Sequence, residues 1–242
     1  MSGTVVVAHR GDPYRVRENT LPSFRAAIVA GADVVELDVR LTRDGEPVVL
    51  HDPTLKRLWR HDRPVAELTA RQVAELTGGG VPRLAAALAV TSPVRTLIDL
   101  PEPSAATALA AVATVRAAGA TGRVYYCGDP GALRAVRGAD PAAEIALTWK
   151  RTARPRATLL GELRPRWLNY RFGLIDRTTV ELARAEGYEV SAWIADRRRT
   201  MHRLIDLGVD SITTNRVALL RALVRAHDGA PLAQGRVPGT RG

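Results

Sequence analysis

Two histidines and two carboxylates lie at or near the carboxyl ends of apolar, strand-like runs early in the chain. They are His9, Glu36, Asp38 and His51. Histidine has a resting pKa that suits proton transfer at neutral pH, so two facing histidines can act as base and acid across a scissile bond. Paired carboxylates are typical ligands of a divalent cation. The pattern therefore predicts a metal-assisted acid–base site.

Glu36 and Asp38 stand two apart on an otherwise apolar strand, so both side chains point to the same side. Buried together they repel each other and lose hydration, and a divalent cation relieves both effects. Oxygen ligands favour magnesium, calcium or manganese over zinc. The alternative is an exposed edge strand, or a salt bridge to Arg40, but the apolar neighbours favour the metal site. Asp99, near the end of a later strand, is either a third oxygen ligand or a turn acid before Pro101.

Strand-like runs alternate with helix-like segments, which predicts an α/β fold with parallel strands. Candidate site residues come from many successive strands, and this favours a TIM (β/α)8 barrel over a doubly wound open sheet. One strand is in excess of the eight that such a barrel needs, and we expect either 144–149 or 167–170 to be accessory. The expected strands are 4–8, 34–39, 47–50, 95–100, 123–127, 144–149, 167–170, 189–194 and 210–214.

The barrel is expected to occupy residues 1–228 as a single domain, with a short insertion after the third strand. The insertion, 52–80, contains a helix-like stretch capped by Thr69 and should form part of the active-site wall. Residues 229–242 are rich in Gly, Pro and Arg and are predicted to be a disordered tail. Further helices are expected at 21–30 (capped by Asn19 or Thr20), 82–90, 105–118, 133–137, 176–186, 197–207 and 217–226.

Composition restricts the class of protein. The net charge of +10 comes almost entirely from arginine, and no nucleic-acid recognition motif accompanies it, so we expect a small-molecule substrate and no nucleic-acid partner. No apolar stretch approaches the length of a membrane span, and we expect no stable membrane association. The lone Cys127 excludes an internal disulfide and, with no visible secretory signal, favours a cytoplasmic protein. The sequence leaves the oligomeric state open.

Five short motifs, taken together in this order and spacing, resemble the glycerophosphodiester phosphodiesterase family. They are His9-Arg10-Gly11, Glu18-Asn19-Thr20, Glu36-x-Asp38, Asp44-Gly45 and His51-Asp52. The segments 81–84, around Trp193 and 208–214 extend the similarity over nearly the whole chain. The resemblance implies a TIM-type barrel that cleaves glycerophosphodiesters to glycerol 3-phosphate and an alcohol with a divalent metal.

The resemblance also implies roles for individual residues. The catalytic pair would be His9 and His51, the glycerol 2-hydroxyl would be the internal nucleophile, and a cyclic phosphate would form and then be hydrolysed. Which histidine is acid and which is base stays open. The metal ligands for magnesium or calcium would be Glu36, Asp38 and Asp99, and the substrate-binding residues Arg10, Glu18, Lys150 and Trp193.

Some positions depart from the family pattern. The family usually has Glu-x-Lys on the fourth strand, whereas Asp99 is followed here by leucine and proline. Lys150, at the end of a later strand, is either the substitute for that lysine or a surface residue. Asn215 follows Thr214 where the family usually has an acid, which affects substrate identity more than reaction class. His61-Asp62 repeats the look of His51-Asp52 but follows no strand, and we interpret it as a loop pair.

Two other functions remain open. One is a related activity on lipids, as in the lysophospholipase D and sphingomyelinase D relatives. The other is a catalytically weakened barrel that binds phosphodiesters, which the missing lysine motivates and the two retained histidines oppose.

Overall fold

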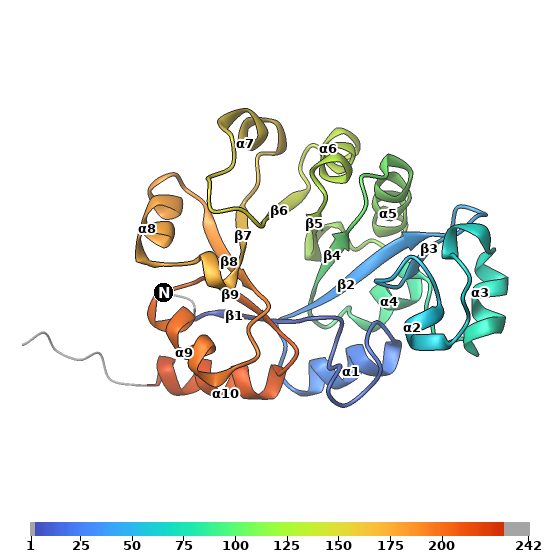
Figure 1. The fold of residues 1–242 in the computed structure, drawn as a ribbon, viewed down its shortest axis with the longest axis horizontal. Coiled ribbons are helices and arrows are strands. Elements are labelled where there is room, and N and C mark those ends of the chain that lie inside the picture. The colour runs from blue at the N-terminus through green and yellow to red at the C-terminus, as the bar shows by residue number, and fades with distance from the viewer. Residues whose placement is uncertain (1–2, 230–242) are drawn as a thin grey trace, which may run out of the picture.

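The strands pair side by side in a closed ring in the computed structural model, which describes residues 3–229. Their order is β1-β9-β8-β7-β6-β5-β4-β2, all neighbours are parallel, and β2 pairs with β1 to close the ring (Figure 1). The predicted TIM barrel is therefore confirmed. The ring strands are β1 (Val5–Ala8), β2 (Val34–Leu41), β4 (Arg95–Leu100), β5 (Val124–Gly128), β6 (Glu144–Trp149), β7 (Trp167–Arg171), β8 (Glu189–Trp193) and β9 (Ser211–Thr214).

The extra strand is not the one predicted. Both 144–149 and 167–170 belong to the ring, as β6 and β7, and the accessory strand is β3 (Pro47–Val49). A tight turn at Arg43-Asp44-Gly45 folds β3 back so that it runs antiparallel to the last residues of β2. The prediction was wrong because an apolar run of three or four residues does not reveal the direction or the partner of a strand.

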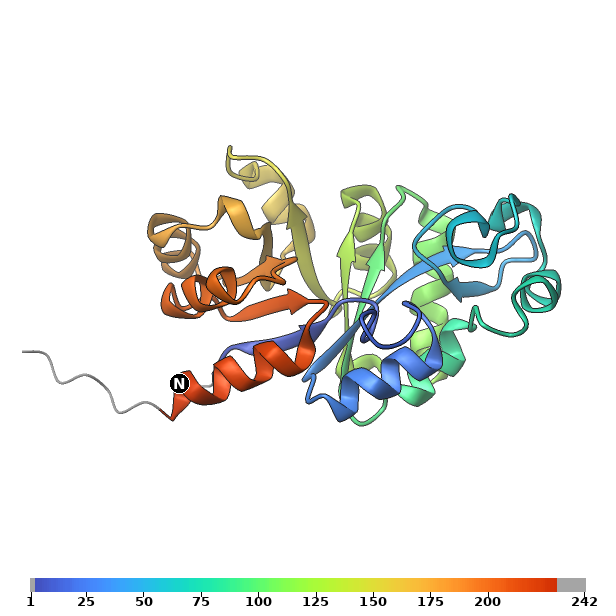
Figure 2. The same ribbon diagram turned by 60° about the horizontal axis from the view of Figure 1, so that its bottom comes forward.

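Helices surround the ring, and α10 packs along β1 (Figure 2). Thr20, rather than Asn19, caps α1, and Asp176 caps α8. The predicted helices are confirmed, whereas α2 and α7 were not predicted. The helices are α1 (Leu21–Val29), α2 (Lys56–Trp59), α3 (Ala70–Thr77), α4 (Leu84–Val90), α5 (Ala105–Ala117), α6 (Pro130–Ala139), α7 (Ala157–Leu163), α8 (Arg177–Ala185), α9 (Arg198–Asp206) and α10 (Val217–Asp228). Short 3-10 turns occupy Val65–Glu67, Thr121–Arg123 and Phe172–Leu174.

Side chains point alternately to the two faces of each strand, and this divides the core into two layers. Val35, Leu37 and Val39 of β2 join the cluster between strands and helices. Val34 faces the interior of the ring, in a cluster with residues such as Tyr125 and Trp167. Glu36 and Asp38 therefore share the inward side with Val34, as the spacing predicts.

The insertion after β3 forms a small core of its own beside the barrel. Val48, Leu55, Val65 and Val73 are buried in it, and Thr69 caps α3 with a complete capping box. In the described part of the chain, every helix is too short or too polar to cross a membrane. The predicted tail, apart from Gly229, lies outside the described residues.

Candidate active site

Seven of the nine predicted site residues line one cavity of about 160 Å³ at the carboxyl ends of the strands. The other two, Glu18 and Asp38, do not line it but form ion pairs with Arg10, which does. The seven lining residues are His9, Arg10, Glu36, His51, Asp99, Lys150 and Trp193. Residues that are far apart in sequence thus meet because parallel strands end at the same face of the barrel.

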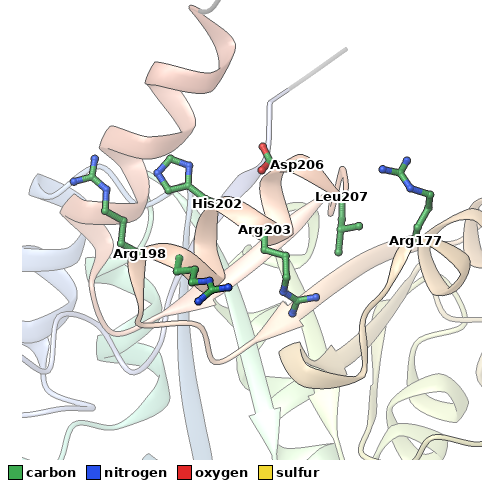
Figure 3. A pocket seen from close by; sticks show the side chains of 7 residues that line it. Arg177, Arg198, His202, Arg203, Asp206 and Leu207 are labelled. Carbon is green, nitrogen blue, oxygen red and sulfur yellow. The ribbon is translucent and has the colours of Figure 1, made fainter.

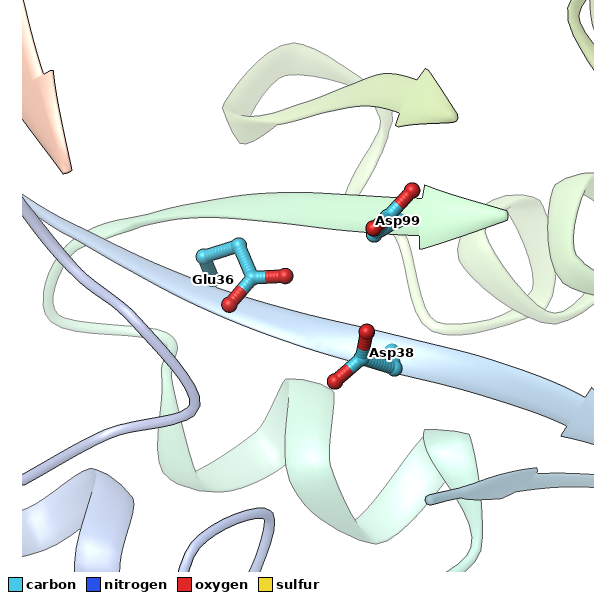
Figure 4. Close-up of side chains that lie close together, drawn as sticks. All are labelled: Glu36, Asp38 and Asp99. Atoms are coloured by element: carbon cyan, nitrogen blue, oxygen red, sulfur yellow. The ribbon is translucent and has the colours of Figure 1, made fainter. Parts of the chain in front are cut away.

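Glu36, Asp38 and Asp99 form a carboxylate cluster within this face (Figure 4). One oxygen from each lies within 4.8 Å of the others. The register of β2 and β4 sets Asp38 directly beside Asp99, and Glu36 and Asp38 are only 4% and 1% exposed. Ordinary packing gives no reason to gather three acids of which two are buried, so the cluster needs positive charge.

Arg10 supplies part of that charge. Its backbone N–H donates to Glu36 Oε2 at 2.8 Å, and its guanidinium Nε lies 3.0 Å from Asp38 Oδ2. Arg10 has a φ of +57°, and the following Gly11 has a φ of +90°. A Cβ at Gly11 would lie 2.3 Å from the Ser23 hydroxyl oxygen, so only glycine lets the loop turn Arg10 onto the acids.

The positive charge of Arg10 alone does not neutralise the carboxylate cluster. Burial and the neighbouring charge of Asp38 raise the pKa of Glu36 above its ordinary range and raise that of Asp99 to about 6. Asn19 Nδ2 donates to Asp38 Oδ2 at 2.7 Å, but within residues 3–229 the buried Asp38 Oδ1 has no hydrogen-bond partner. An unpartnered, buried carboxylate oxygen in an all-oxygen cluster fits a magnesium or calcium ion.

His9 is held in one orientation by a relay of hydrogen bonds. Asn215 Nδ2 and backbone N–H both donate to the Asp196 carboxylate, at 2.7 and 2.8 Å. The amide oxygen of Asn215 must therefore face His9 Nδ1, 2.8 Å away, and accept a hydrogen bond from its N–H. Burial and the charge of Arg10 lower the pKa of His9 below 6.5. The neutral ring then has its proton on Nδ1, which leaves Nε2 as a base.

His51 is held differently. Its Nδ1 lies 2.7 Å from Asp52 Oδ1, and Arg57 of α2 bonds both Asp52 and Glu18. The hydrogen bond from Arg57 lowers the pKa of Asp52 to about 2, so Asp52 stays ionised beside the ring. Glu18 also accepts from Arg10 at 2.9 Å. The structure thus places Glu18 between two arginines, and a direct contact of Glu18 with substrate remains a prediction.

Lys150 reaches the cavity from the end of β6, and its ammonium group lies 5.7 Å from the centre of the Trp193 ring. The Trp193 indole N–H donates to the backbone oxygen of Asn169, which fixes the ring in the wall. This position is compatible with the predicted substitution of Lys150 for the missing lysine, which stays a prediction.

Some residues of this site were missed in the sequence, and one pair that was set aside lies in a loop, as expected. Arg57 and Asp196 had no signal beyond their type, because their partners lie in other elements. Asn19 was noted only within a motif and as a possible helix cap, and its contact with Asp38 was not predicted. His61-Asp62 is the loop pair expected, with Asp62 in an exposed ion pair to Lys56 outside the cavity.

Comparison with known proteins identifies relatives over almost the whole chain. The family model described as the glycerophosphoryl diester phosphodiesterase family matches residues 9–219. A glycerophosphodiester phosphodiesterase of Caldanaerobacter subterraneus is 29% identical over 92% of this chain and 98% of its own. A probable glycerophosphodiester phosphodiesterase 2 of Mycobacterium tuberculosis is 33% identical over 94% of each. The fold matches an Oleispira antarctica phosphodiesterase in complex with the product sn-glycerol-3-phosphate, at a TM-score of 0.79, 23% identity and coverage of 92% and 97%.

Proposed function

The chain belongs to the glycerophosphoryl diester phosphodiesterase family of hydrolases, and from this we propose that it cleaves glycerophosphodiesters to glycerol 3-phosphate and an alcohol. The observation that carries the proposal is the cavity at the strand ends. It brings two histidines, a carboxylate cluster and two cationic side chains, Arg10 and Lys150, around one small space. A phosphodiester needs this combination, because its anionic oxygens must be neutralised while protons move to and from its ester oxygens.

His9 is the general base of the proposed reaction. The relay through Asn215 and Asp196 directs its proton to Nδ1, and its lowered pKa keeps the ring neutral at physiological pH. Nε2 then removes the proton of the glycerol 2-hydroxyl, whose oxygen bonds to phosphorus. Because this nucleophile is tethered within the substrate, the step avoids the entropic cost of bringing in a separate molecule.

His51 is the general acid. It lines both the cavity and an adjacent groove, where the leaving oxygen would lie, and the contact of its Nδ1 with Asp52 Oδ1 at 2.7 Å holds the ring in place. The bond from phosphorus to the leaving oxygen breaks as His51 donates its proton to that oxygen. A water oxygen then bonds to phosphorus as His51 takes its proton, and the bond from phosphorus to the glycerol 2-oxygen breaks as His9 returns a proton to that oxygen. This gives glycerol 3-phosphate and restores both histidines.

Glu36, Asp38 and Asp99 would hold a magnesium or calcium ion, which when bound neutralises charge on the phosphate. Arg10 contributes a second positive group that can reach a phosphate oxygen with its guanidinium fork. Names of relatives and the product bound to the Oleispira enzyme support the same substrate class. The single cysteine, buried as a free thiol, supports a cytoplasmic site of action.

The test is release of glycerol 3-phosphate from glycerophosphocholine, glycerophosphoethanolamine and glycerophosphoinositol, with magnesium, calcium or a chelator. We expect release that requires metal and is lost in His51→Ala, and unchanged release in the matched His61→Ala variant. No release from any diester by the folded, metal-loaded protein would overturn the proposal. Turnover of a lysolipid instead would identify the lipid activity, and a ligand-induced melting shift without turnover would identify a binding protein.

A further inference from the structure

A groove of about 600 Å³ lies beside the catalytic cavity. The two spaces share four lining residues, which include His51 and Lys150. The rest of the groove is lined by Pro101 after β4, by the ends of β5 and β6 and the loops that follow them, and by residues of α6 and α7. Because His51 lies at the junction and faces the leaving oxygen in the proposed reaction, the leaving alcohol must extend into this groove.

The groove carries unpaired positive charge. In the part of the chain from 3 to 229, Lys150, Arg151 and Arg156 have no carboxylate within salt-bridge distance. Arg134 also lines the groove, but Glu162 pairs with it at 2.8 Å. Two acids line the groove as well: Asp99 belongs to the metal cluster, and Asp129 caps α6 by accepting from Gly131 N at 2.7 Å. The local charge balance therefore favours an anion.

Aromatic rings near the groove do not offset this preference. A quaternary ammonium group such as choline binds best against open aromatic faces. Here the Arg151 guanidinium carbon lies 5.9 Å from the centre of the Trp149 ring, and the Lys150 ammonium 5.7 Å from that of Trp193. Both tryptophans already carry one of the protein's own cations. A positively charged alcohol would meet repulsion where an aromatic cage would be needed.

Resting on the proposed function, we propose that this groove binds the leaving alcohol and selects one that carries a negative charge, such as a phosphorylated polyol. Lys150, Arg151 and Arg156 provide the recognition, and Arg156 is the clearest probe because it lies outside the catalytic cavity. A neutral polyol should be accepted less well and a choline ester least well.

A second arginine cluster provides a control. Arg177, Arg198, Arg199, His202 and Arg203 lie together on α8 and α9 (Figure 3), and this surface shares no lining residue with the cavity or the groove. Loss of Arg198 removes the same unit of charge from the molecule as loss of Arg156. Any effect that arises from net charge alone will appear in both variants.

The experiment compares kcat/KM for glycerophosphoinositol 4-phosphate, glycerophosphoinositol and glycerophosphocholine by release of glycerol 3-phosphate. The first two differ by one phosphate group on the leaving alcohol, which adds negative charge to it. We expect the phosphorylated diester to be preferred over the unphosphorylated one by about tenfold at low ionic strength, with the preference reduced by salt. Glycerophosphocholine should be the poorest of the three.

Single-residue variants then test which arginine causes the preference for the charged leaving alcohol. Arg156→Gln should lower the preference about threefold and Arg156→Glu should nearly abolish it, whereas Arg198→Gln should leave it unchanged. Turnover of all three diesters without a charge preference, or with the choline ester preferred, would overturn the assignment of the groove and leave the proposed function intact. A preference unaffected by Arg156→Glu would also overturn it. Failure of all three substrates would instead count against the proposed function.

Discussion

Replacing Asp99 by asparagine tests the metal centre through stability, independently of turnover. The carboxylate oxygens of Glu36, Asp38 and Asp99 lie within 4.8 Å of one another. Two unit charges at that separation repel by about 3 kcal/mol at an effective dielectric constant of about 20. Burial and Asp38 raise the pKa of Asp99 from 3.8 to about 6, which corresponds to about 3 kcal/mol at about 1.4 kcal/mol per pKa unit. Arg10 offsets part of this repulsion, so about 3 kcal/mol is an upper figure.

The sign of the effect follows from the direction of the pKa shift. Because the pKa of Asp99 is higher in the folded state, its penalty is absent below the unfolded value of 3.8, grows as pH rises to about 6, and stays constant above that. An asparagine stays neutral and has no such penalty. In chelator, Asp99→Asn should therefore be more stable than the wild type by up to about 3 kcal/mol near pH 8 and equally stable near pH 3. Added magnesium or calcium should stabilise the wild type much more than the variant.

The assay is urea unfolding of both proteins across this pH range, with chelator and with excess magnesium or calcium. Asp176→Asn is the matched control, because it removes one acid at the cap of α8 and asparagine caps a helix equally well. Equal stability of the wild type and Asp99→Asn in chelator at alkaline pH would refute the argument from crowded charge. Equal stabilisation of both by metal would remove Asp99 from the ligand set.

Three further predictions concern the residues around the cavity. Lys150→Ala should lower kcat/KM by about ten- to a hundredfold, because it removes a charged contact to phosphate, and normal kinetics would show that Lys150 is a surface residue. Asp196→Asn should lower kcat without unfolding the protein, because the Asn215 amide can then turn its NH2 group to His9. The double change Asp196→Asn with Asn215→Asp should recover part of kcat. It should also raise the pH at which activity falls on the acid side. His61→Ala should change kcat and KM by less than about twofold, and a larger loss would place this loop pair in the reaction.

Much of the candidate site could be predicted because the place of its residues in the sequence indicates their place in the barrel. His9, Glu36 and Asp99 lie at or near the ends of apolar runs, and the ends of parallel strands converge whatever the details of packing. The same local reasoning misassigned β3, because an apolar run records burial but not direction. It also missed Arg57, which comes from a four-residue helix in the insertion and reaches the site only through the packing of that insertion.

The departure at Asn215 shows that a residue pattern does not reveal which side chains contact one another in the fold. In the sequence, Asn215 stands where the resembled family usually has an acid, a departure that we interpret as affecting substrate identity more than reaction class. In the fold, the acid is Asp196, which accepts hydrogen bonds from the side-chain and the backbone N–H of Asn215. These bonds fix the face that the amide presents to His9. The relay still sets the tautomer of the base, but it puts a neutral amide rather than a carboxylate against the ring. Burial and the charge of Arg10 lower the pKa of His9, and the amide fixes its tautomer, so Nε2 is free to accept a proton at neutral pH.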